Sequence, residues 1–466
     1  MLRLYTTLKR IQKPNVRFLR NNNHSAVYPR LLRDFPKTQC SVLSNGLTVA
    51  TEERQCNNVC IGFYIDAGSR HENESENGIT HFFEHIAFKG TTNTSKTDLE
   101  SEIGKTGAKF QCFTTRDTSV YYAECLSSEA KCVADILFDC IFNNSFSDTE
   151  IEIQKNTVRD EMLMHDRFSV NILHDYLHSS AFQGTQLGQT VMGPSSNLHN
   201  LKSSVISDYI TKLFIPERIV FAAVGNIKHD LMMNLGQQYC IATECPKCVS
   251  LGSLRYTGSQ IVYRDDSMDV GHIAIAVEGP SFGDKDKIVM ELAALVLGGW
   301  DKSQPSGTTH GVHLACVASA GGLCKSYKTF QYYYQDVGLW GVEYISSRDE
   351  VDDMLLAVQN EWMRLCYLIT DDELIRAKNE MKSKIIMNYQ STVYTCHDIG
   401  YNILRNGHYS DLHEIISIID KITANDLKNV CGKYIYDRCP VVAGIGSTEN
   451  LLSYSRIRSY MYWLRV

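Results

Sequence analysis

An internal repeat constrains the fold of this 466-residue chain more than any other feature of its sequence. Residues 214–225 read FIPERIVFAAVG, and residues 434–446, which begin 220 positions later, read YIYDRCPVVAGIG. Each stretch is typical of a helix end, a turn with an acid–arginine pair, and an apolar strand that closes at a glycine. A second pair of stretches, 150–156 and 373–379, repeats at a spacing of 223 residues. The chain is therefore expected to fold as two similar halves of roughly 210 residues each.

Both halves combine strand-like and helical segments. Period-two or continuous apolar patterns predict strands at 47–51, 59–65, 119–125, 270–277 and 338–345. The strands come in groups and the helices in blocks, which predicts an α+β fold of layered sandwich type in each half. We place the first domain at 34–240, a linker at 241–258 and the second domain at 259–466.

The first 33 residues differ in composition from the rest. They hold eight Lys or Arg and no Asp or Glu, with leucines and an isoleucine between the basic positions. This Arg-rich, acid-poor, amphipathic pattern is typical of a mitochondrial transit peptide, although a basic tail that binds an anionic surface has the same composition. We expect residues 1–33 to be such a transit peptide and the protein to reside in the mitochondrial matrix.

The charge and hydropathy of the chain exclude some functions. Removal of residues 1–33 would lower the formal charge by eight, from −7 to −15. So acidic a body disfavours nucleic acid as a partner and suits cationic ones. No apolar run approaches the roughly 18 residues that a membrane helix needs, so no transmembrane segment is expected.

The stretch from His81 to His85 reads H-x-x-E-H. On a helix, His81 and His85 lie one turn apart on the same face, where two imidazoles can bind one Zn²⁺, and Glu84 projects to the same side as a base. This order is the inverzincin signature. Two histidines on a helix also occur as ordinary core or surface residues, but here the apolar neighbours would leave them in need of partners.

A hydrolytic zinc site takes three protein ligands, so a third must come from elsewhere in the chain. Residues 148–166 predict a helix and offer several carboxylates, and their spacing alone does not choose among Glu150, Glu152, Asp160 and Glu161. In the second half, the corresponding stretch 290–299 contains no histidine. The second half is therefore expected to be a degenerate copy that holds no metal and builds the wall of a cavity enclosed by the two halves.

Longer stretches carry a family resemblance over nearly the whole chain after about residue 35. They are Asp66–Arg70, Gly78–Thr91, Gly338–Gly341 and Trp362–Cys366. In these residues the chain resembles the pitrilysin-type peptidases of family M16, and within them the branch of the mitochondrial processing peptidase β subunits and core protein 1 of the cytochrome bc1 complex.

The resemblance implies one Zn²⁺ per chain on His81, His85 and Glu161, with Glu84 activating water. It also implies that the edge strand Gln111-Cys112-Phe113 pairs with the substrate backbone and that Phe88 lines the pocket for the residue after the cut. Substrates of the family are basic presequences with an arginine two residues before the scissile bond, and Asp175 matches one acid that meets this arginine.

Three positions depart from the family pattern. Gln154 stands where a carboxylate usually supports the metal site, which should weaken zinc binding. Asn171 replaces the second acid that meets the substrate arginine. The edge strand has Gln-Cys-Phe in place of the usual Asn-Ala-Tyr.

Two functions from different classes are compatible with these residues. The first is a zinc metalloendopeptidase that acts as the catalytic β-type subunit of a heterodimer, whose α-type subunit carries a glycine-rich loop. The second is a core structural subunit of the cytochrome bc1 complex, with or without residual peptidase activity. The complete set at 81, 84, 85 and 161 favours the peptidase.

Overall fold

The computed structural model of the chain describes residues 36–239, 254–304 and 306–463. The predicted transit peptide, 1–33, lies outside the described residues, and so does most of the predicted linker, 241–258. Among the described residues, no helix is both long enough and apolar enough to cross a bilayer.

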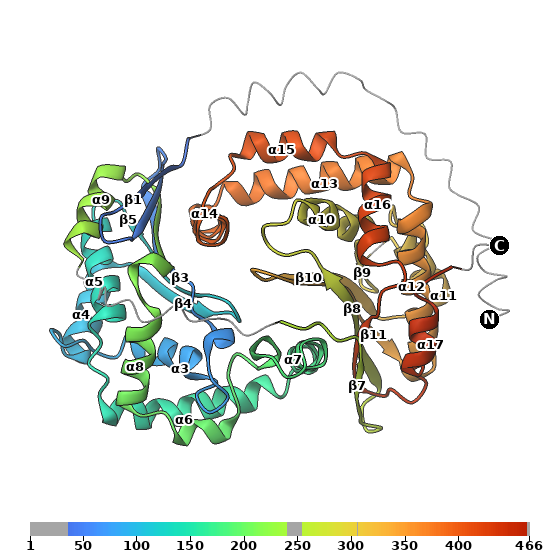
Figure 1. The fold of residues 1–466 in the computed structure, drawn as a ribbon, viewed down its shortest axis with the longest axis horizontal. Helices are drawn as coiled ribbons and strands as arrows, with labels where there is room; N and C mark the ends of the chain where they lie inside the picture. Colours follow the sequence, from blue (N-terminus) through green and yellow to red (C-terminus); the bar gives the residue numbers. More distant parts are fainter. Residues whose placement is uncertain (1–35, 240–253, 305, 464–466) are drawn as a thin grey trace.

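The described chain forms two similar halves, each built on one six-stranded sheet with helices around it (Figure 1). The first sheet has the order β1-β2-β6-β3-β5-β4, and the second has the order β7-β12-β8-β11-β10-β9. The strands of the first are β1 Gln39–Val42, β2 Thr48–Glu53, β3 Asn58–Ile65, β4 Lys109–Thr114, β5 Ser119–Leu126 and β6 Ile219–Gly225. Those of the second are β7 Gln260–Arg264, β8 Val270–Gly279, β9 Gly299–Asp301, β10 Ser326–Tyr333, β11 Gly338–Ser347 and β12 Val441–Gly446.

The helices follow the same repeat as the strands. The first half contains α3 Ile79–Ala87, α4 Lys96–Thr106, α5 Ala130–Phe142, α6 Asp148–His165, α7 Ser169–Ala181, α8 Ser203–Leu213 and α9 His229–Gln238. The second contains α10 Asp286–Leu297, α11 His313–Gly321, α12 Val351–Tyr367, α13 Asp371–Tyr389, α14 Thr392–Asn406, α15 Leu412–Lys421, α16 Ala424–Tyr434 and α17 Tyr454–Ser459. Short 3₁₀ turns, among them η3 Ser69–His71, connect some of these elements.

The two repeated sequence stretches occupy equivalent places in the two sheets. β6 pairs parallel with β2 and antiparallel with β3, and β12 pairs parallel with β7 and antiparallel with β8. The predicted α+β architecture of two related halves is therefore confirmed.

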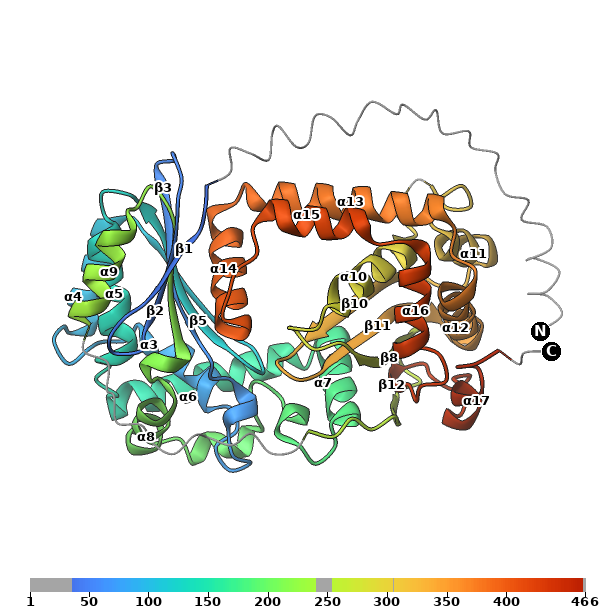
Figure 2. The same ribbon diagram turned by 45° about the horizontal axis from the view of Figure 1, so that its top comes forward.

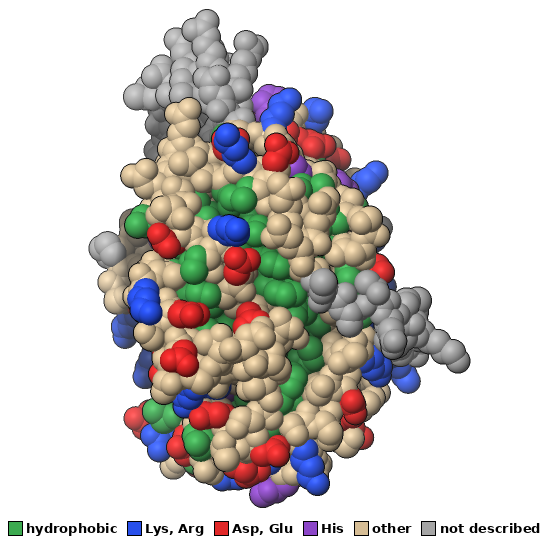
Figure 3. Space-filling model, turned by 90° about the vertical axis from the view of Figure 1, so that its left-hand side faces the viewer, with side chains coloured by type: hydrophobic (Ala, Val, Ile, Leu, Met, Phe, Trp, Pro, Cys, Tyr) green, Lys and Arg blue, Asp and Glu red, His purple; other side chains and the backbone are tan. Residues whose placement is uncertain are grey.

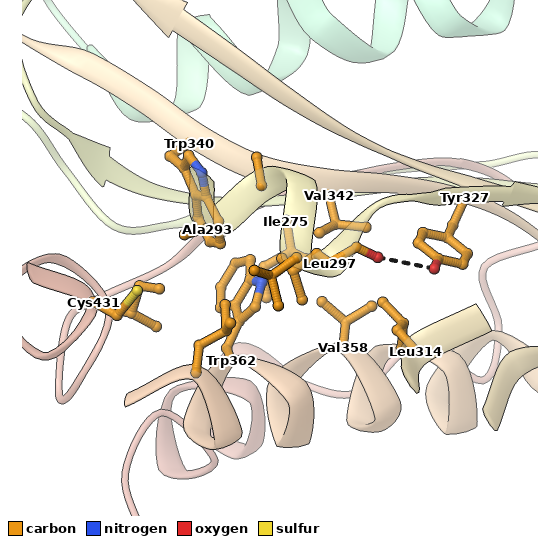
Figure 4. Close-up of a cluster of buried hydrophobic side chains, with 14 of the residues drawn as sticks. Ile275, Ala293, Leu297, Leu314, Tyr327, Trp340, Val342, Val358, Trp362 and Cys431 are labelled. Carbon is orange, nitrogen blue, oxygen red and sulfur yellow. Dashed lines mark hydrogen bonds between the residues drawn. The ribbon is translucent and has the colours of Figure 1, made fainter. Parts of the chain in front are cut away.

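Each sheet is covered on both faces, and this explains why its central strands are apolar without alternation. On β3, Ile61 and Phe63 pack beneath the outer helices, while Cys60 and Tyr64 point to the opposite face and are equally buried. The outer layer of the second half buries Trp340 and Trp362 side by side (Figure 4). The Trp340 indole N–H donates to the Met290 carbonyl at 3.0 Å, so the buried ring leaves no polar atom unpaired.

The inner face of each sheet is covered by a helix of the other half (Figures 1 and 2). α14, from the second half, places Cys396, Ile399 and Ile403 against β3 and β6 of the first. In return, α7 of the first half places Leu173 and Leu177 against β8 and β12 of the second. The two halves therefore exchange helices and complete each other's cores.

The outer face of the first half carries a band of hydrophobic side chains (Figure 3). There a groove of about 600 Å³ runs beside α4 and α5, and its lining includes Leu99, Ile136, Phe138 and Tyr239. The rings of Phe138 and Tyr239 stack at 4.2 Å and form one wall of the groove.

The close packing of α14 on the first sheet predicts that one added methyl group, at Gly400, lowers the stability of the protein. A Cβ on Gly400 of α14 would lie 2.5 Å from the buried ring of Tyr64 on β3. We expect Gly400→Ala to lower the free energy of unfolding by about 1–3 kcal/mol, the usual cost of overpacking. Denaturant unfolding measures this effect.

Gly432→Ala is the matched control, since it lies within α16 and a Cβ there would meet nothing within 4 Å. It should leave stability unchanged or raise it by up to about 1 kcal/mol. Equal effects of the two variants would contradict the tight packing of α14 on the first sheet.

Candidate metal centre

The H-x-x-E-H stretch lies on α3, a short helix whose two ends are held by buried side chains. The Glu72 carboxylate, fully buried before the helix, accepts from the backbone N–H groups of Gly78 and Thr80 at 2.7 and 2.8 Å. It also accepts from the Thr80 hydroxyl at 2.5 Å. At the other end, the Asn144 amide donates to the Ile86 and Ala87 carbonyls, both at 3.1 Å. These bonds satisfy terminal helix groups that would otherwise be unpaired in the core.

The start of α3 requires a glycine for two reasons. Gly78 has a φ of 102°, in the left-handed region that disfavours side chains. A Cβ there would also lie 2.4 Å from the Met192 carbonyl oxygen. The close approach of the segments that contain Gly78 and Met192 thus fixes the position of the start of α3.

The structure brings His81, His85 and Glu161 together. One nitrogen of each imidazole and one oxygen of Glu161, on α6, all lie within 4.8 Å of one another. His85 Nε2 is 2.8 Å and His81 Nε2 is 3.3 Å from Glu161 Oε2. Glu150, Glu152 and Asp160 are not part of this group.

The electrostatics of the group suit a cation. Burial alone would lower the pKa of His81, but the neighbouring carboxylates of Glu161 and Glu84 outweigh it and raise this pKa to about 9. The two imidazoles in turn hold the pKa of Glu161 well below its usual range. The site thus stabilises positive charge next to the Glu161 carboxylate.

The residues present fit a zinc ion. His81 Nε2 and Glu161 Oε2 are buried atoms that, although 3.3 Å apart, find no hydrogen bond of good geometry among the described residues. Buried polar atoms without a partner are rare in proteins, and a shared metal would give them one. Two imidazole nitrogens and a carboxylate oxygen form the three-ligand set of catalytic zinc sites, which leaves a position for water or substrate. Glu161 is 40% exposed, so the group is open on that side.

Glu84 lies beside these three residues rather than among them. Its Oε1 is 3.8 Å from His81 Nδ1, and its side chain is 14% exposed. Such a carboxylate is positioned to act as a base next to the group without being one of its ligands.

The predicted substrate strand lies at the edge of the first sheet. β4, at the end of the strand order, contains Gln111, Cys112 and Phe113. Their side chains alternate: Cys112 Sγ donates to the Glu84 carbonyl at 3.7 Å, while the Phe113 ring lies 5.5 Å from His397 on α14. Gln111 accepts from the Tyr122 hydroxyl at 2.7 Å. Among the described strands β4 pairs only with β5, so backbone groups on its other edge are available to an added strand.

Phe88 lies at the end of α3 and Gln154 lies within α6, the two helices that carry His81, His85 and Glu161. Phe88 follows the last turn of α3, with its ring 5.9 Å from that of Phe110. Gln154 is buried on α6, two turns before Glu161 and on the same side of that helix.

The two residues expected to meet a substrate arginine lie one turn apart on α7. Asn171 is exposed. Asp175 is already paired: its Oδ1 accepts from Arg116 Nη2 at 2.7 Å, and its Oδ2 is 3.7 Å from His165 Nε2. Since Arg116 is buried and its charge needs this partner, much of the charge of Asp175 is already compensated. The contact of Asp175 with a substrate arginine stays a prediction.

Sequence reasoning missed the residues that position α3. Glu72 is one of three glutamates in the stretch 72–76, and spacing does not distinguish it from Glu74 and Glu76. Asn144 follows a helix with no motif that relates it to α3. Arg116, near the predicted strands, carries no sequence signal for a bond to Asp175.

Comparison with known proteins shows similarity to peptidase family M16 over most of the chain. The family model "Insulinase (Peptidase family M16)" matches residues 48–195, and the model "Peptidase M16 inactive domain" matches 200–381. The cytochrome b-c1 complex subunit 1 of Mus musculus is 38% identical over 445 residues, which cover 95% of this chain and 93% of that protein. The mitochondrial-processing peptidase subunit beta of Homo sapiens is 37% identical over 439 residues, which cover 94% and 90%.

A solved structure shares the fold. It is described as complex III2 from Candida albicans with Inz-5 bound, and it superposes with a TM-score of 0.81 at 24% identity, over 91% of this chain and all of that one. The relatives thus divide between a peptidase subunit and a respiratory-complex subunit, and both groups are mitochondrial.

The capping of α3 leads to a stability prediction. Glu72→Gln replaces an acceptor of several buried hydrogen bonds with an amide that must turn an N–H toward some of the same donors. We expect a loss of about 2 kcal/mol in the free energy of unfolding, typical of hydrogen bonds to a charged group. Urea denaturation measures it, with the exposed Glu74→Gln as a control that should change stability by less than about 0.5 kcal/mol. A similar small change in both variants would show that Glu72 does not hold α3.

Proposed function

The chain belongs to peptidase family M16, and we propose that within this family it is a zinc-dependent metalloendopeptidase. Its proposed role is that of the catalytic β-type subunit that removes basic presequences from imported mitochondrial precursor proteins. The observation that carries the proposal is the convergence of His81, His85 and Glu161 within 4.8 Å, with Glu84 beside them. A purely structural subunit has no need of this set.

The residues divide the work of peptide hydrolysis. His81, His85 and Glu161 would hold the Zn²⁺, and Gln154 would support the site from α6. When bound, the ion supplies Lewis acidity that polarises the scissile carbonyl and acidifies a water molecule. Glu84 accepts the proton of the attacking water and passes it to the leaving nitrogen, which is general base and then general acid catalysis by one carboxylate.

The free edge of β4 orients the substrate. An extended presequence that adds to this edge would form backbone hydrogen bonds beside α3, since Cys112 already contacts the Glu84 carbonyl. Gln111, Cys112 and Phe113 would contribute to this contact, and Phe88 would line the pocket after the cut. We propose that an α-type subunit with a glycine-rich loop completes the enzyme as a heterodimer.

A second candidate is favoured by the nearly equal identity to cytochrome b-c1 complex subunit 1. In this reading the chain is a core subunit of the bc1 complex on the matrix face of the inner membrane. Gln154 and Asn171, which lack the charges usual in the peptidase branch, fit a relaxed constraint on catalysis. Identification of the proteins that co-purify with the chain distinguishes the roles, since an α-type subunit alone supports the first and respiratory-complex subunits support the second.

The peptidase proposal predicts a split between metal content and activity. Glu84→Gln should retain one zinc per chain and lower kcat on a basic presequence peptide by at least about 100-fold, because it removes the base but no ligand. His85→Ala should lose both zinc and activity. Metal analysis and a cleavage assay of the heterodimer measure these effects. Wild-type protein without zinc, or cleavage unchanged in Glu84→Gln, would refute the assignment.

Positions 171 and 175 on α7 predict a weak preference for a substrate arginine. Asn171 is neutral and Asp175 is paired with Arg116, so a substrate arginine meets little net charge. Asn171→Glu should raise the preference for arginine over glutamine two residues before the cut by about twofold to fivefold, as expected of an exposed ion pair. Competition between two such peptides measures kcat/KM for each. Asn171→Gln is the matched control, and a preference that does not change in Asn171→Glu would remove position 171 from the substrate pocket.

A further inference from the structure

One buried arginine connects the two halves next to the metal-binding helix. Arg70, 3% exposed, lies in η3 of the first half. Its guanidinium donates to both carboxylate oxygens of Asp336 in the second half, at 2.8 and 2.5 Å. Its Nη1 also lies 3.5 Å from Asp117 Oδ1. The bidentate contact is the strongest and most directional form of arginine–carboxylate pairing.

The two aspartates occupy equivalent turns of the repeat. Asp117 lies in the turn between β4 and β5, and Asp336 lies 219 positions later in the turn between β10 and β11. The turns touch directly, because the Gln335 backbone N–H donates to Asp117 Oδ2 at 3.1 Å. Arg405 of α14 approaches Asp117 Oδ2 to 3.8 Å and donates to the Tyr333 carbonyl at 2.7 Å. Arg70 is thus fixed at the point where the two hairpin tips meet.

A short covalent path leads from Arg70 to the metal-binding helix. Glu72, whose carboxylate caps α3, is only two residues after Arg70 and immediately follows η3. The backbone between them has little freedom: the Arg70 N–H donates to the Arg116 carbonyl at 2.9 Å. A Cβ on Gly68 would lie 2.5 Å from the carbonyl oxygens of Thr115 and Arg116. Arg70 and Glu72 therefore belong to one tightly packed turn, and we expect the loss of the Arg70 side-chain contacts to loosen that turn at Glu72.

The ion pair is not needed to hold the halves together. The exchanged helices bury several large apolar side chains at the interface, and such burial is the dominant favourable contribution to packing. Asp336 is 46% exposed, so its pair with Arg70 contributes far less to the cohesion of the halves. The loss of this pair should act locally, on η3 and on the start of α3.

We propose that Asp336 and Arg70 are positioning residues through which the second half sets the place of α3 and of its three metal-facing side chains. The inference rests on the proposed function only in the identity of the metal. It assigns a task to the half that has no ligands: a carboxylate of the second half orients the arginine that precedes the Glu72 cap.

The test uses the full chain with the substitution Asp336→Asn, which leaves Arg70 with one acceptor oxygen in place of a carboxylate. Two readouts are measured: backbone hydrogen exchange of residues 79–87 in the metal-free protein, and the affinity for zinc alone in competition with a chelator. We expect exchange to be about tenfold faster and zinc binding to be about tenfold weaker. Asp336→Glu, which keeps the carboxylate, should restore both toward the wild-type values.

The matched control is Asp437→Asn, which removes a surface aspartate of the second half paired with Arg458 at 2.8 Å. It should leave both readouts unchanged. Arg70→Lys keeps the charge but loses the bidentate fork, so it should reproduce the effect of Asp336→Asn; it also serves as the second variant if Asp336→Asn fails to fold. Exchange at 79–87 equal to wild type in Asp336→Asn and Arg70→Lys would overturn the inference. If the wild-type chain binds no zinc, the proposed function fails while the exchange measurement still decides this one.

Discussion

The position of α3 depends on the buried carboxylate of Glu72. The described residues offer it no cationic partner and satisfy it through hydrogen bonds at the start of that helix. Burial raises the pKa of Glu72, and the N–H groups and hydroxyl that surround it oppose this rise. A nine-residue helix is too short to be stable on its own. Glu72 and Asn144 together give α3 a defined start and end. The orientation of α3 in turn determines where the imidazoles of His81 and His85 point.

The exchange of helices explains why the half with the candidate metal-binding residues is accompanied by a half without them. α14 covers the inner face of the first sheet, where Tyr64 and Cys60 would otherwise meet water. Loss of α14 would expose the apolar side chains of that face, and net domain stability is only about 5–15 kcal/mol. The second half is therefore a structural requirement of the first.

The sequence predicted the parts of this molecule that follow from local periodicity and from the repeat. The spacing of His81, Glu84 and His85 places them on one helical face, and the repeated strands are equivalent in the two sheets. The third member of the group, Glu161, could not be chosen by spacing, because four carboxylates of one helix are offered there; family resemblance was needed. Nothing in the local sequence of α7 indicates that this helix packs on the other half's sheet. Partners such as Arg116 for Asp175 arise from tertiary contacts, which local pattern does not encode.

The exchange of α14 has a consequence for the order in which the chain can fold. Cys396 and Ile399 on α14 pack against Cys60 and Tyr64, more than 330 residues earlier in the sequence. β12, which joins β7 to β8 in the second sheet, lies later still, at Val441–Gly446. A chain that emerges from its N-terminal side must therefore keep an apolar sheet face uncovered until almost all of it is present, and such long-range closure is slow and prone to aggregation. Because the halves exchange helices, the incomplete chain exposes an apolar sheet face of the kind that chaperones bind.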